Sequence, residues 1–174
     1  MSPAWMLYGL ERYLRRPGRK IIRWDYPQVF VDPARNVEKL SEALQNCKSP
    51  SIYLIGHSFG DWIARSAIND CKLPAIKKLI SICPALAPVP FAKVFSPLFG
   101  WLIPELVVMK DPELISVPIS SELSTQRTII WARFEFIVSR PPGLEINHEV
   151  LGTHITSVFQ PSLWRMVEEE LASK

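Results

Sequence analysis

The sequence has few of the residues that build metal sites or disulfide frameworks. Its 174 residues include three cysteines, three histidines and seven glycines. The cysteines are odd in number and show no Cys-x-x-Cys spacing, which argues against a disulfide framework and against a zinc site. We therefore expect a reducing, cytoplasmic environment and no metal. The sequence also lacks a Gly-rich phosphate loop, so no cofactor is expected.

Long apolar runs and strong charge are also missing. The most apolar stretch, residues 84–108, contains five prolines and cannot form a membrane span. The N-terminal residues lack the unbroken apolar core and cleavage site of a signal peptide. The formal charge is only +3 and no nucleic-acid motif is present, so we expect no nucleic-acid partner. A basic cluster near the N-terminus favours a solvated helix end, with phosphate or anionic lipid as the alternative contact: Arg12, Arg15, Arg16, Arg19, Lys20 and Arg23.

What the chain does contain is an alternation of apolar strands and amphipathic helices. Hydrophobic residues make up 48% of it and charged residues 21%, typical of a globular protein, and we predict one domain over residues 1–174. Apolar periodicity predicts strands at 21–24, 51–55, 78–83, 128–131 and 145–150. It predicts helices at 4–16, 32–44, 59–69 and from 161 onward. The alternation predicts an α/β fold with a mostly parallel sheet flanked by helices.

The most informative segment joins the second predicted strand to a helix. After Ile52-Tyr53-Leu54-Ile55 the chain reads Gly56-His57-Ser58-Phe59-Gly60, and a helical pattern follows at once. Gly-x-Ser-x-Gly between a buried strand and a helix indicates a strained turn that exposes a nucleophilic serine. We expect both glycines to allow close approach of strand and helix, and the Phe59 N–H to face an oxyanion. An ordinary glycine-rich loop is the alternative.

A serine hydroxyl needs a base to remove its proton, and only three histidines are available. His57 adjoins Ser58 on the turn, where its side chain should point away from the hydroxyl. His148 alternates with apolar residues in a predicted strand. His154 lies in a glycine-bearing loop before the last helix, from which the imidazole can reach back over the strand ends. We predict His154 as the general base, with His148 as the alternative.

The acid that orients the base should follow a strand between the serine and the histidine in chain order. Glu135 leaves the predicted strand 128–131 between two phenylalanines, and a carboxylate buried there needs a partner. We predict Glu135 as this acid, the alternative being an ion pair with Arg133 or Arg140. Weaker candidates are Asp111, Glu113, Glu122 and Asp61, of which the last is expected to stabilise its own helix N-terminus.

These residues together resemble the α/β-hydrolase superfamily, in particular its lipase- and esterase-like members. The resemblance covers most of the chain and rests on the segment 56–60, the order of Ser58, Glu135 and His154, and the segments 25–27 and 137–138. It implies a serine hydrolase that cleaves carboxylic esters through an acyl-enzyme. Ser58 would be the nucleophile, His154 the base, Glu135 the orienting acid and Phe59 an oxyanion donor. A thioesterase or acyltransferase with the same triad, and a non-catalytic or incomplete protein, are the alternatives.

The chain departs from the family pattern before its first helix. Members place there a strand and a His-Gly loop that supplies the second oxyanion donor, whereas only residues 1–3 precede the predicted helix here. We expect either that the strand 21–24 pairs directly with the nucleophile strand or that a sheet edge is left unpaired. The sequence thus predicts a truncated α/β-hydrolase fold. Losing one oxyanion donor would lower the rate on the order of a hundred- to a thousandfold.

Residues 84–118 lie between two predicted strands, where the family often inserts a cap. Their Pro, Phe, Leu and Val content predicts an apolar lid that recognises an acyl chain or a lipid surface, with a plain helix packed on the core as the alternative. The expected partner is a small-molecule ester or lipid, with peripheral membrane contact through this segment. The residues predicted to bind substrate are Phe91, Phe95, Phe99 and Trp101.

Overall fold

The computed structural model describes residues 4–173 and is built on a four-stranded parallel sheet. The strands follow one another in the order β1-β2-β3-β4, and every neighbouring pair is parallel. Their central residues are apolar and largely β-branched, which suits a sheet that is buried on both faces. The predicted α/β class is confirmed. The strands are β1 (Ile52–His57), β2 (Ile76–Ile82), β3 (Gln126–Phe134) and β4 (His148–Thr153).

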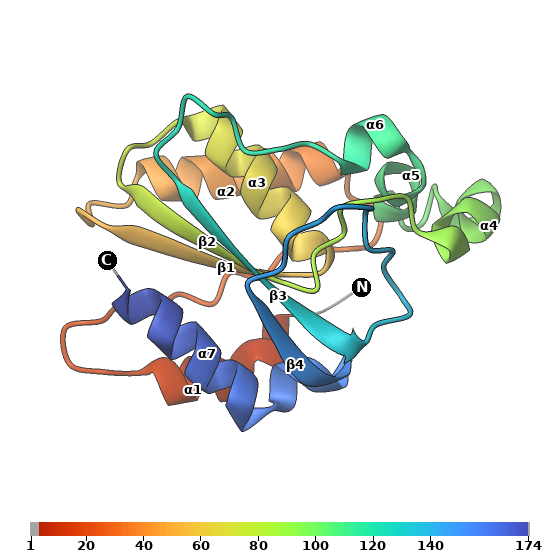
Figure 1. The fold of residues 1–174 in the computed structure, drawn as a ribbon. Helices are drawn as coiled ribbons and strands as arrows, with labels where there is room; N and C mark the ends of the chain where they lie inside the picture. Colours follow the sequence, from red (N-terminus) through yellow and green to blue (C-terminus); the bar gives the residue numbers. More distant parts are fainter. Residues whose placement is uncertain (1–3, 174) are drawn as a thin grey trace.

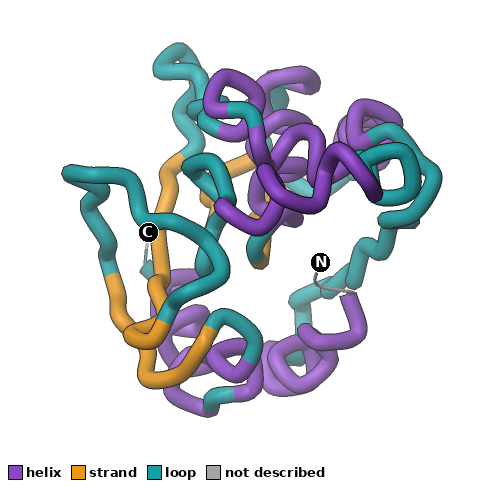
Figure 2. Tube along the Cα trace, turned by 90° about the vertical axis from the view of Figure 1, so that its right-hand side faces the viewer, coloured by secondary structure: helices purple, strands orange, loops and turns teal. Residues whose placement is uncertain are grey.

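Helices cover both faces of this sheet (Figure 1). One face carries α2 (Pro33–Gln45) and α3 (Phe59–Cys71). The other carries α1 (Tyr8–Leu14) and α7 (Pro161–Ala172), together with the short 3-10 turns η1 (Ala4–Leu7) and η2 (Thr156–Phe159). Figure 2, turned by 90°, shows helices on both sides of the strands. Parallel strands require such crossover connections, because a tight hairpin cannot join them.

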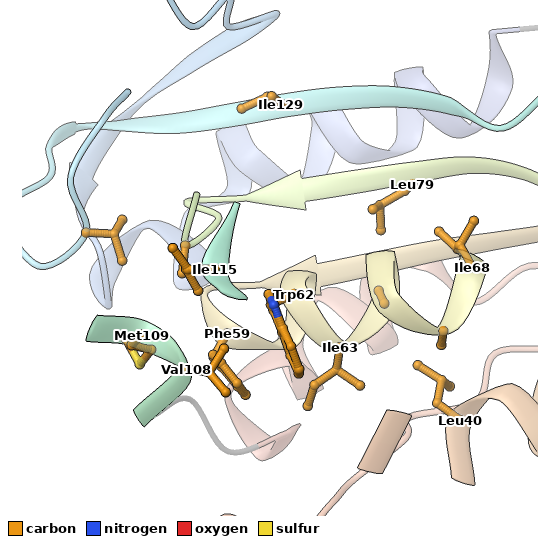
Figure 3. Packing of buried hydrophobic residues seen from close by; sticks show 14 of the residues in the cluster. Leu40, Phe59, Trp62, Ile63, Ile68, Leu79, Val108, Met109, Ile115 and Ile129 are labelled. Carbon is orange, nitrogen blue, oxygen red and sulfur yellow. The ribbon is translucent and has the colours of Figure 1, made fainter. Parts of the chain in front are cut away.

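The sheet divides the hydrophobic core into two clusters. The first packs Leu79 and Ile129 of the sheet against α3, as Figure 3 shows with Trp62, Ile63 and Ile68. The second packs the opposite face of the sheet against α1 and α7 and contains Leu10, Ile80, Ile130, Val150, Leu163 and Val167. Both layers hold the strands in place, so the loops at the carboxyl ends of the strands start from fixed points.

Two strand boundaries differ from the prediction in a way that affects the candidate site. The strand predicted at 145–150 lies three residues further on as β4, which places His154 directly after its last residue. The strand predicted at 128–131 extends to Phe134, so Glu135 is the first residue after β3. Both candidate residues therefore leave the same end of neighbouring parallel strands.

The strand predicted over residues 21–24 is wrong. This segment is irregular, and Ile22 is 66% exposed. The run is short and Arg23 interrupts it, so it buries too little apolar surface to fix an extended conformation without a neighbouring strand. β1 is consequently an edge of the sheet.

The open edge of β1 exposes alternate backbone groups. The N–H groups of Ile52 and Ser58 donate to Ala75 and Ile82 on the β2 side, at 2.8 and 3.0 Å. The alternation of a parallel ladder then turns the backbone of Tyr53, Ile55 and His57 the other way. These groups have no backbone hydrogen bond among residues 4–173. Of the two arrangements expected from the sequence, the structure has the unpaired edge.

The segment 84–118 forms three short helices. The sequence predicts an apolar lid here, with a single helix packed on the core as the alternative. They are α4 (Pro90–Phe99), α5 (Glu105–Lys110) and α6 (Pro112–Ile115), and they lie together at one end of the molecule (Figure 1). Within α4 only Ala92 and Ser96 are buried. The large apolar side chains exposed on and beside α4 are Phe91, Val94, Phe95, Leu98, Phe99 and Trp101. None of the helices in the described part of the chain is both long and apolar enough to cross a membrane.

The basic cluster near the N-terminus contacts acidic side chains. Arg15 and Arg23 both reach Glu11, at 2.7 and 3.3 Å, and Arg19 pairs with Glu168 of α7 at 2.8 Å. Surface pairs of this kind contribute at most about 1 kcal/mol each. Their geometry is that of a solvated helix end with local counter-charges.

Candidate active site

Ser58 occupies a strained turn between β1 and α3. Its backbone has φ 56° and ψ −125°, a conformation that costs a non-glycine residue on the order of 1–3 kcal/mol. The turn is held by the Ser58 N–H, which donates to Ile82 O at 3.0 Å, and by the Ser58 carbonyl, which accepts from Asp61 N at 3.2 Å. Such strain persists only where the surrounding structure imposes it, and the predicted elbow geometry is present.

The two glycines of the motif differ in what they allow. A Cβ atom at Gly56 would lie 2.6 Å from Asp61 Cα, so this position requires glycine for β1 and α3 to approach. A Cβ atom at Gly60 would meet nothing within 4 Å. The expectation that both glycines serve close approach is therefore wrong for Gly60, because this residue faces open space in the first turn of α3.

The Phe59 N–H, which the sequence predicts as an oxyanion donor, lies at the N-terminal end of α3 directly after Ser58. Phe59 is the first residue of α3, where backbone N–H groups have no partner inside the helix. No backbone hydrogen bond within residues 4–173 uses this group. The N-terminal end of the helix also favours negative charge. The position can thus stabilise an anion beside Ser58.

His154 and Glu135 form a buried hydrogen-bonded pair. His154 Nδ1 lies 2.7 Å from Glu135 Oε2, and the two side chains are 4% and 2% exposed. The other carboxylate oxygen accepts from the N–H groups of Ile137 and Val138, at 2.8 and 3.0 Å. Burial alone would raise the pKa of Glu135, but these hydrogen bonds, that of His154 first, outweigh it and lower the pKa. Glu135 is thus held as a carboxylate that fixes the imidazole.

The alternative partners of Glu135 and His154 are engaged elsewhere. Arg133 donates to Glu149 at 2.7 Å, and Arg140 donates to the Leu144 carbonyl at 2.8 Å. His148, the alternative base, lies 2.7 Å from Glu170 of α7. Among the other acidic candidates, Asp111 accepts from the N–H groups of Glu113 and Leu114 at the start of α6.

His57 contacts the loop that carries His154, a role that its place next to Ser58 does not reveal in the sequence. Its Nε2 donates to the His154 carbonyl at 3.0 Å, and the two imidazole rings lie 4.9 Å apart between centroids. Burial, followed by the nearby His154, lowers the pKa of His57 to about 3. His57 is therefore neutral at physiological pH and brings the His154 loop to the residue beside Ser58.

Asp61 anchors the elbow through a buried ionic network. Its carboxylate accepts from Arg65 at 2.7 Å, from Arg127 at 3.0 Å and from Ser81 at 2.5 Å. Asp61 and Arg65 are both fully buried. Asp61 lies in the first turn of α3, where the sequence predicted that it stabilises the helix N-terminus, and its side chain also links α3 to β2 and β3.

Arg65 also connects α3 to the segment that follows β2. Its guanidinium donates to the carbonyls of Ala85, Ile115 and Val117, at the start and the end of the three-helix segment. The indole N–H of Trp62 donates to the Leu114 carbonyl at 2.7 Å. Both ends of the segment are therefore attached to the helix that begins at the candidate nucleophile.

Cys83 lies at the pair formed by His154 and Glu135. The sequence predicts only a buried small hydrophobe here, and the residue is indeed fully buried with φ 43°. Its sulfur, a Glu135 oxygen and a His154 ring nitrogen all lie within 4.8 Å of one another. Burial, followed by the Glu135 carboxylate, raises the pKa of Cys83 to about 12. The thiol is accordingly protonated and a poor nucleophile.

An apolar hollow of about 220 Å³ opens in the three-helix segment. Three of the four predicted substrate-binding residues line it, and Trp101 does not: it is 71% exposed and its ring lies 5.8 Å from that of Phe30. Met109, in the wall of the hollow, belongs to the same buried cluster as Phe59, the residue after Ser58 (Figure 3). The lining residues are Phe91, Phe95, Phe99, Ile103, Leu106 and Met109.

Glu105 is a buried carboxyl group on α5 that no sequence pattern distinguishes. It is 1% exposed, and neither carboxylate oxygen has a hydrogen-bond partner among the described residues. Burial raises the pKa of Glu105 to about 7. The group therefore changes its charge near neutral pH.

The arrangement brings a nucleophile candidate, a base and an acid to the carboxyl end of the sheet. The hydrogen bonds within residues 4–173 do not include one between Ser58 Oγ and His154. Such contacts commonly tighten only when substrate binds. Chemically, the site can activate a hydroxyl group and stabilise one developing negative charge.

Comparison with known proteins places the fold. No family model and no curated protein matches the chain. Polyneuridine aldehyde esterase is 15% identical to this chain with a TM-score of 0.66, and the match covers 98% of this chain and 95% of the esterase. An extracellular α/β-hydrolase from a Paenibacillus species is 15% identical with a TM-score of 0.63, and the match covers 98% of this chain and 93% of that protein. A thioesterase domain from the curacin biosynthetic pathway is 11% identical with a TM-score of 0.50, and the match covers 82% of this chain and 74% of that domain. At these identities the likeness is one of fold.

Proposed function

Because the chain has the α/β-hydrolase fold, we propose that it is a serine hydrolase that cleaves carboxylic esters through an acyl-enzyme. The observation that carries this proposal is the buried His154–Glu135 pair, 2.7 Å apart, at the same end of the sheet as the strained Ser58. A strained non-glycine residue points to function, because stability alone would favour glycine at φ 56°.

In the proposed first half-reaction, His154 Nε2 takes the proton of the Ser58 hydroxyl as Oγ attacks the ester carbonyl. The carbonyl electron pair moves to oxygen, and the Phe59 N–H stabilises the resulting oxyanion. The Nδ1–H group of His154 donates a hydrogen bond to the Glu135 carboxylate. This keeps the ring proton on Nδ1 and leaves Nε2 free to act as base. When the oxyanion collapses, the alcohol leaves with the proton that His154 returns.

In the second half-reaction, water replaces the alcohol. His154 removes a proton from water as the water oxygen bonds to the acyl carbon. When this intermediate collapses, the bond from the acyl carbon to Ser58 Oγ breaks, His154 returns the proton to Oγ, and the carboxylic acid leaves. His57 supports both steps by holding the His154 carbonyl at 3.0 Å.

A fluorophosphonate probe followed by peptide mapping tests the nucleophile. We expect covalent labelling at Ser58 in the natural full-length protein and none in Ser58→Ala. His148→Gln, which alters the histidine paired with Glu170, should label like the unmodified chain. Absence of labelling at Ser58 in the folded natural protein would end the proposal and favour a non-catalytic or incomplete α/β-hydrolase-like protein.

A thioesterase or acyltransferase is the second candidate, favoured by the match to the curacin thioesterase domain. The same triad would attack a thioester, whose thiolate leaves more readily than an alkoxide. Paired substrates with one acyl group and either an oxygen or a sulfur leaving group separate the two functions. A kcat/KM at least tenfold higher for the thioester, after correction for its faster uncatalysed hydrolysis, would replace the ester assignment.

We propose that the apolar hollow takes the acyl chain of the substrate. Phe95 and Phe99 line it, with ring centroids 6.1 Å apart. Replacing both with serine should reduce activity on long acyl esters more than on acetyl esters, because only the long chains bury area there. Val94→Ser with Leu98→Ser is the matched control, since these α4 residues are exposed and do not line the hollow. Equal losses on long and short esters would contradict the assignment.

The exposed apolar surface of α4 supports a further part of the proposal, peripheral contact with a lipid surface. Val94 and Leu98 are each 68% exposed on this helix. Replacing both with glutamate should abolish co-sedimentation with phosphatidylcholine vesicles, and unchanged co-sedimentation would refute the contact. The three free cysteines support the proposed cytoplasmic location.

A further inference from the structure

Three donor atoms of the types that zinc prefers converge at the end of the sheet. Cys83 Sγ, a Glu135 carboxylate oxygen and a His154 ring nitrogen all lie within 4.8 Å of one another. They follow β2, β3 and β4, three neighbouring strands of the sheet. Thiolate, carboxylate and imidazole are typical protein ligands of Zn²⁺.

The position of Cys83 has no part in the proposed hydrolysis. Its backbone is held at φ 43°, with the N–H donating to Ile130 O at 2.9 Å, and its sulfur makes a weak contact with Ser157 Oγ at 3.9 Å. Packing would be served as well by alanine, which has no sulfur to direct at Glu135 and His154. The thiol is the one group in this cluster that the triad chemistry leaves unused.

We propose that Cys83, Glu135 and His154 bind a divalent zinc-like cation, and that its binding inhibits the hydrolase. Zinc bonds of about 2.0–2.3 Å at tetrahedral angles place neighbouring donors roughly 3.3–3.8 Å apart. The His154–Glu135 distance of 2.7 Å then has to open by about 1 Å at most, while Cys83 moves inward. Ser157 Oγ or a water molecule can supply the fourth position.

The inhibition follows from proton accounting and rests on the proposed function. The metal bonds to His154 Nδ1, to a Glu135 oxygen and to the Cys83 sulfur, whose thiol proton is released to solvent. In the neutral imidazole the remaining ring proton must then sit on Nε2. This is the nitrogen that would accept the Ser58 proton. Ser58 therefore loses its base, although the metal does not bind Ser58 itself.

Cobalt(II) tests the metal site without any activity measurement, because a cobalt–thiolate bond produces a near-ultraviolet charge-transfer band. We expect this band in the natural protein and its loss in Cys83→Ser. The Cys47→Ser/Cys71→Ser double variant, whose remaining cysteine is Cys83, should keep the band. If Cys83→Ser fails to fold, this double variant still assigns the cobalt–thiolate bond to Cys83. No band in the natural protein with excess cobalt, or loss of the band in the double variant, would overturn the proposal.

Zinc inhibition tests the regulatory part. We expect ester hydrolysis by the natural protein and by the Cys47→Ser/Cys71→Ser variant to be inhibited at the same zinc concentration. Cys83→Ala should require at least tenfold more zinc, and equal sensitivity would refute a role for Cys83. Fluorophosphonate labelling in metal-free buffer reports on the hydrolase separately. A cobalt band without labelling would keep the metal site and remove the hydrolase, and labelling without a band would do the reverse.

Discussion

The two sides of Ser58 are built differently. On the side of β3 and β4, the proposed base and acid are buried and hydrogen-bonded to each other, although His154 follows β4, which is the other edge of the sheet. On the opposite side β1 is a sheet edge, with the backbone of Tyr53, Ile55 and His57 unpaired within residues 4–173. The proposed base and acid therefore fix each other's position, whereas the proposed oxyanion stabilisation depends on the N-terminal end of α3.

This difference indicates where catalytic power would be limited. A triad with one oxyanion donor can form an acyl-enzyme, but each missing donor lowers the rate on the order of a hundred- to a thousandfold. A missing donor would slow acylation of Ser58 as well as deacylation, so labelling and turnover would both be slower. The variants below disturb one side at a time.

The largest effect is expected on the proton-transfer side from Glu135→Gln. The amide keeps the shape but stabilises the wrong imidazole tautomer, so kcat should fall by about a thousand- to ten-thousandfold. Steady-state hydrolysis of a short-chain ester measures this loss. Glu149→Gln, which alters an exposed carboxylate paired with Arg133, is the matched control and should leave kcat within about twofold. Similar kcat values for the two variants would remove Glu135 from the mechanism.

Asp61→Asn removes the buried negative charge that pairs with Arg65 and Arg127 beside the Ser58 turn. Removing this charge leaves Arg65 and Arg127 without their buried partner, and the free energy of unfolding should fall by about 3–5 kcal/mol. Urea denaturation measures the change, and Glu149→Gln should lose less than about 1 kcal/mol in the same assay. Comparable losses would show that the buried network contributes no more than a surface pair.

Phe59→Pro removes the N–H that is the proposed oxyanion donor. Proline is tolerated at the first position of a helix but has no N–H. Phe59→Ala is the control because it also loses the ring while it keeps the donor. We expect kcat of the proline variant to lie about a hundred- to a thousandfold below that of the alanine variant. Equal kcat in the two variants would mean that another group holds the oxyanion.

The smallest effect is a pH dependence of stability through His57. Its pKa of about 3 in the folded protein lies below the unfolded value near 6.5, so folding favours the neutral ring. This contribution is complete above pH 6.5 and is lost as the pH falls toward 3. Between pH 7.5 and 5.0, the natural protein should lose about 2 kcal/mol more than His57→Gln. Parallel pH profiles of the unfolding free energy would contradict this.

The sequence predicts much of the fold because its local signals agree with its packing. β2 and β3 are apolar on both faces, with Ile80 and Ile130 on one face and Leu79 and Ile129 on the other, as a parallel sheet covered by helices requires. The elbow is predictable because one short segment contains strand, turn and helix. His154 and Glu135 could be selected because few residues of the required type follow strands in the right order.

The rest depends on distant neighbours that no local pattern reveals. The segment 21–24 resembles a strand in composition, but a strand needs a partner for its hydrogen bonds, and none is present there. Asp61 and Arg127 are separated by 66 positions and meet only because β3 lies beside β2. Cys83 is directed at the active-site pair by a positive φ angle, which nothing in its apolar surroundings predicts.

The strained backbone of Ser58 has a consequence for stability. Glycine would adopt φ 56° at less cost, so mutation toward glycine is a downhill path in stability that is always open. Ser58→Gly is therefore expected to raise the free energy of unfolding while it abolishes fluorophosphonate labelling, so at this position stability and the proposed chemistry favour different residues.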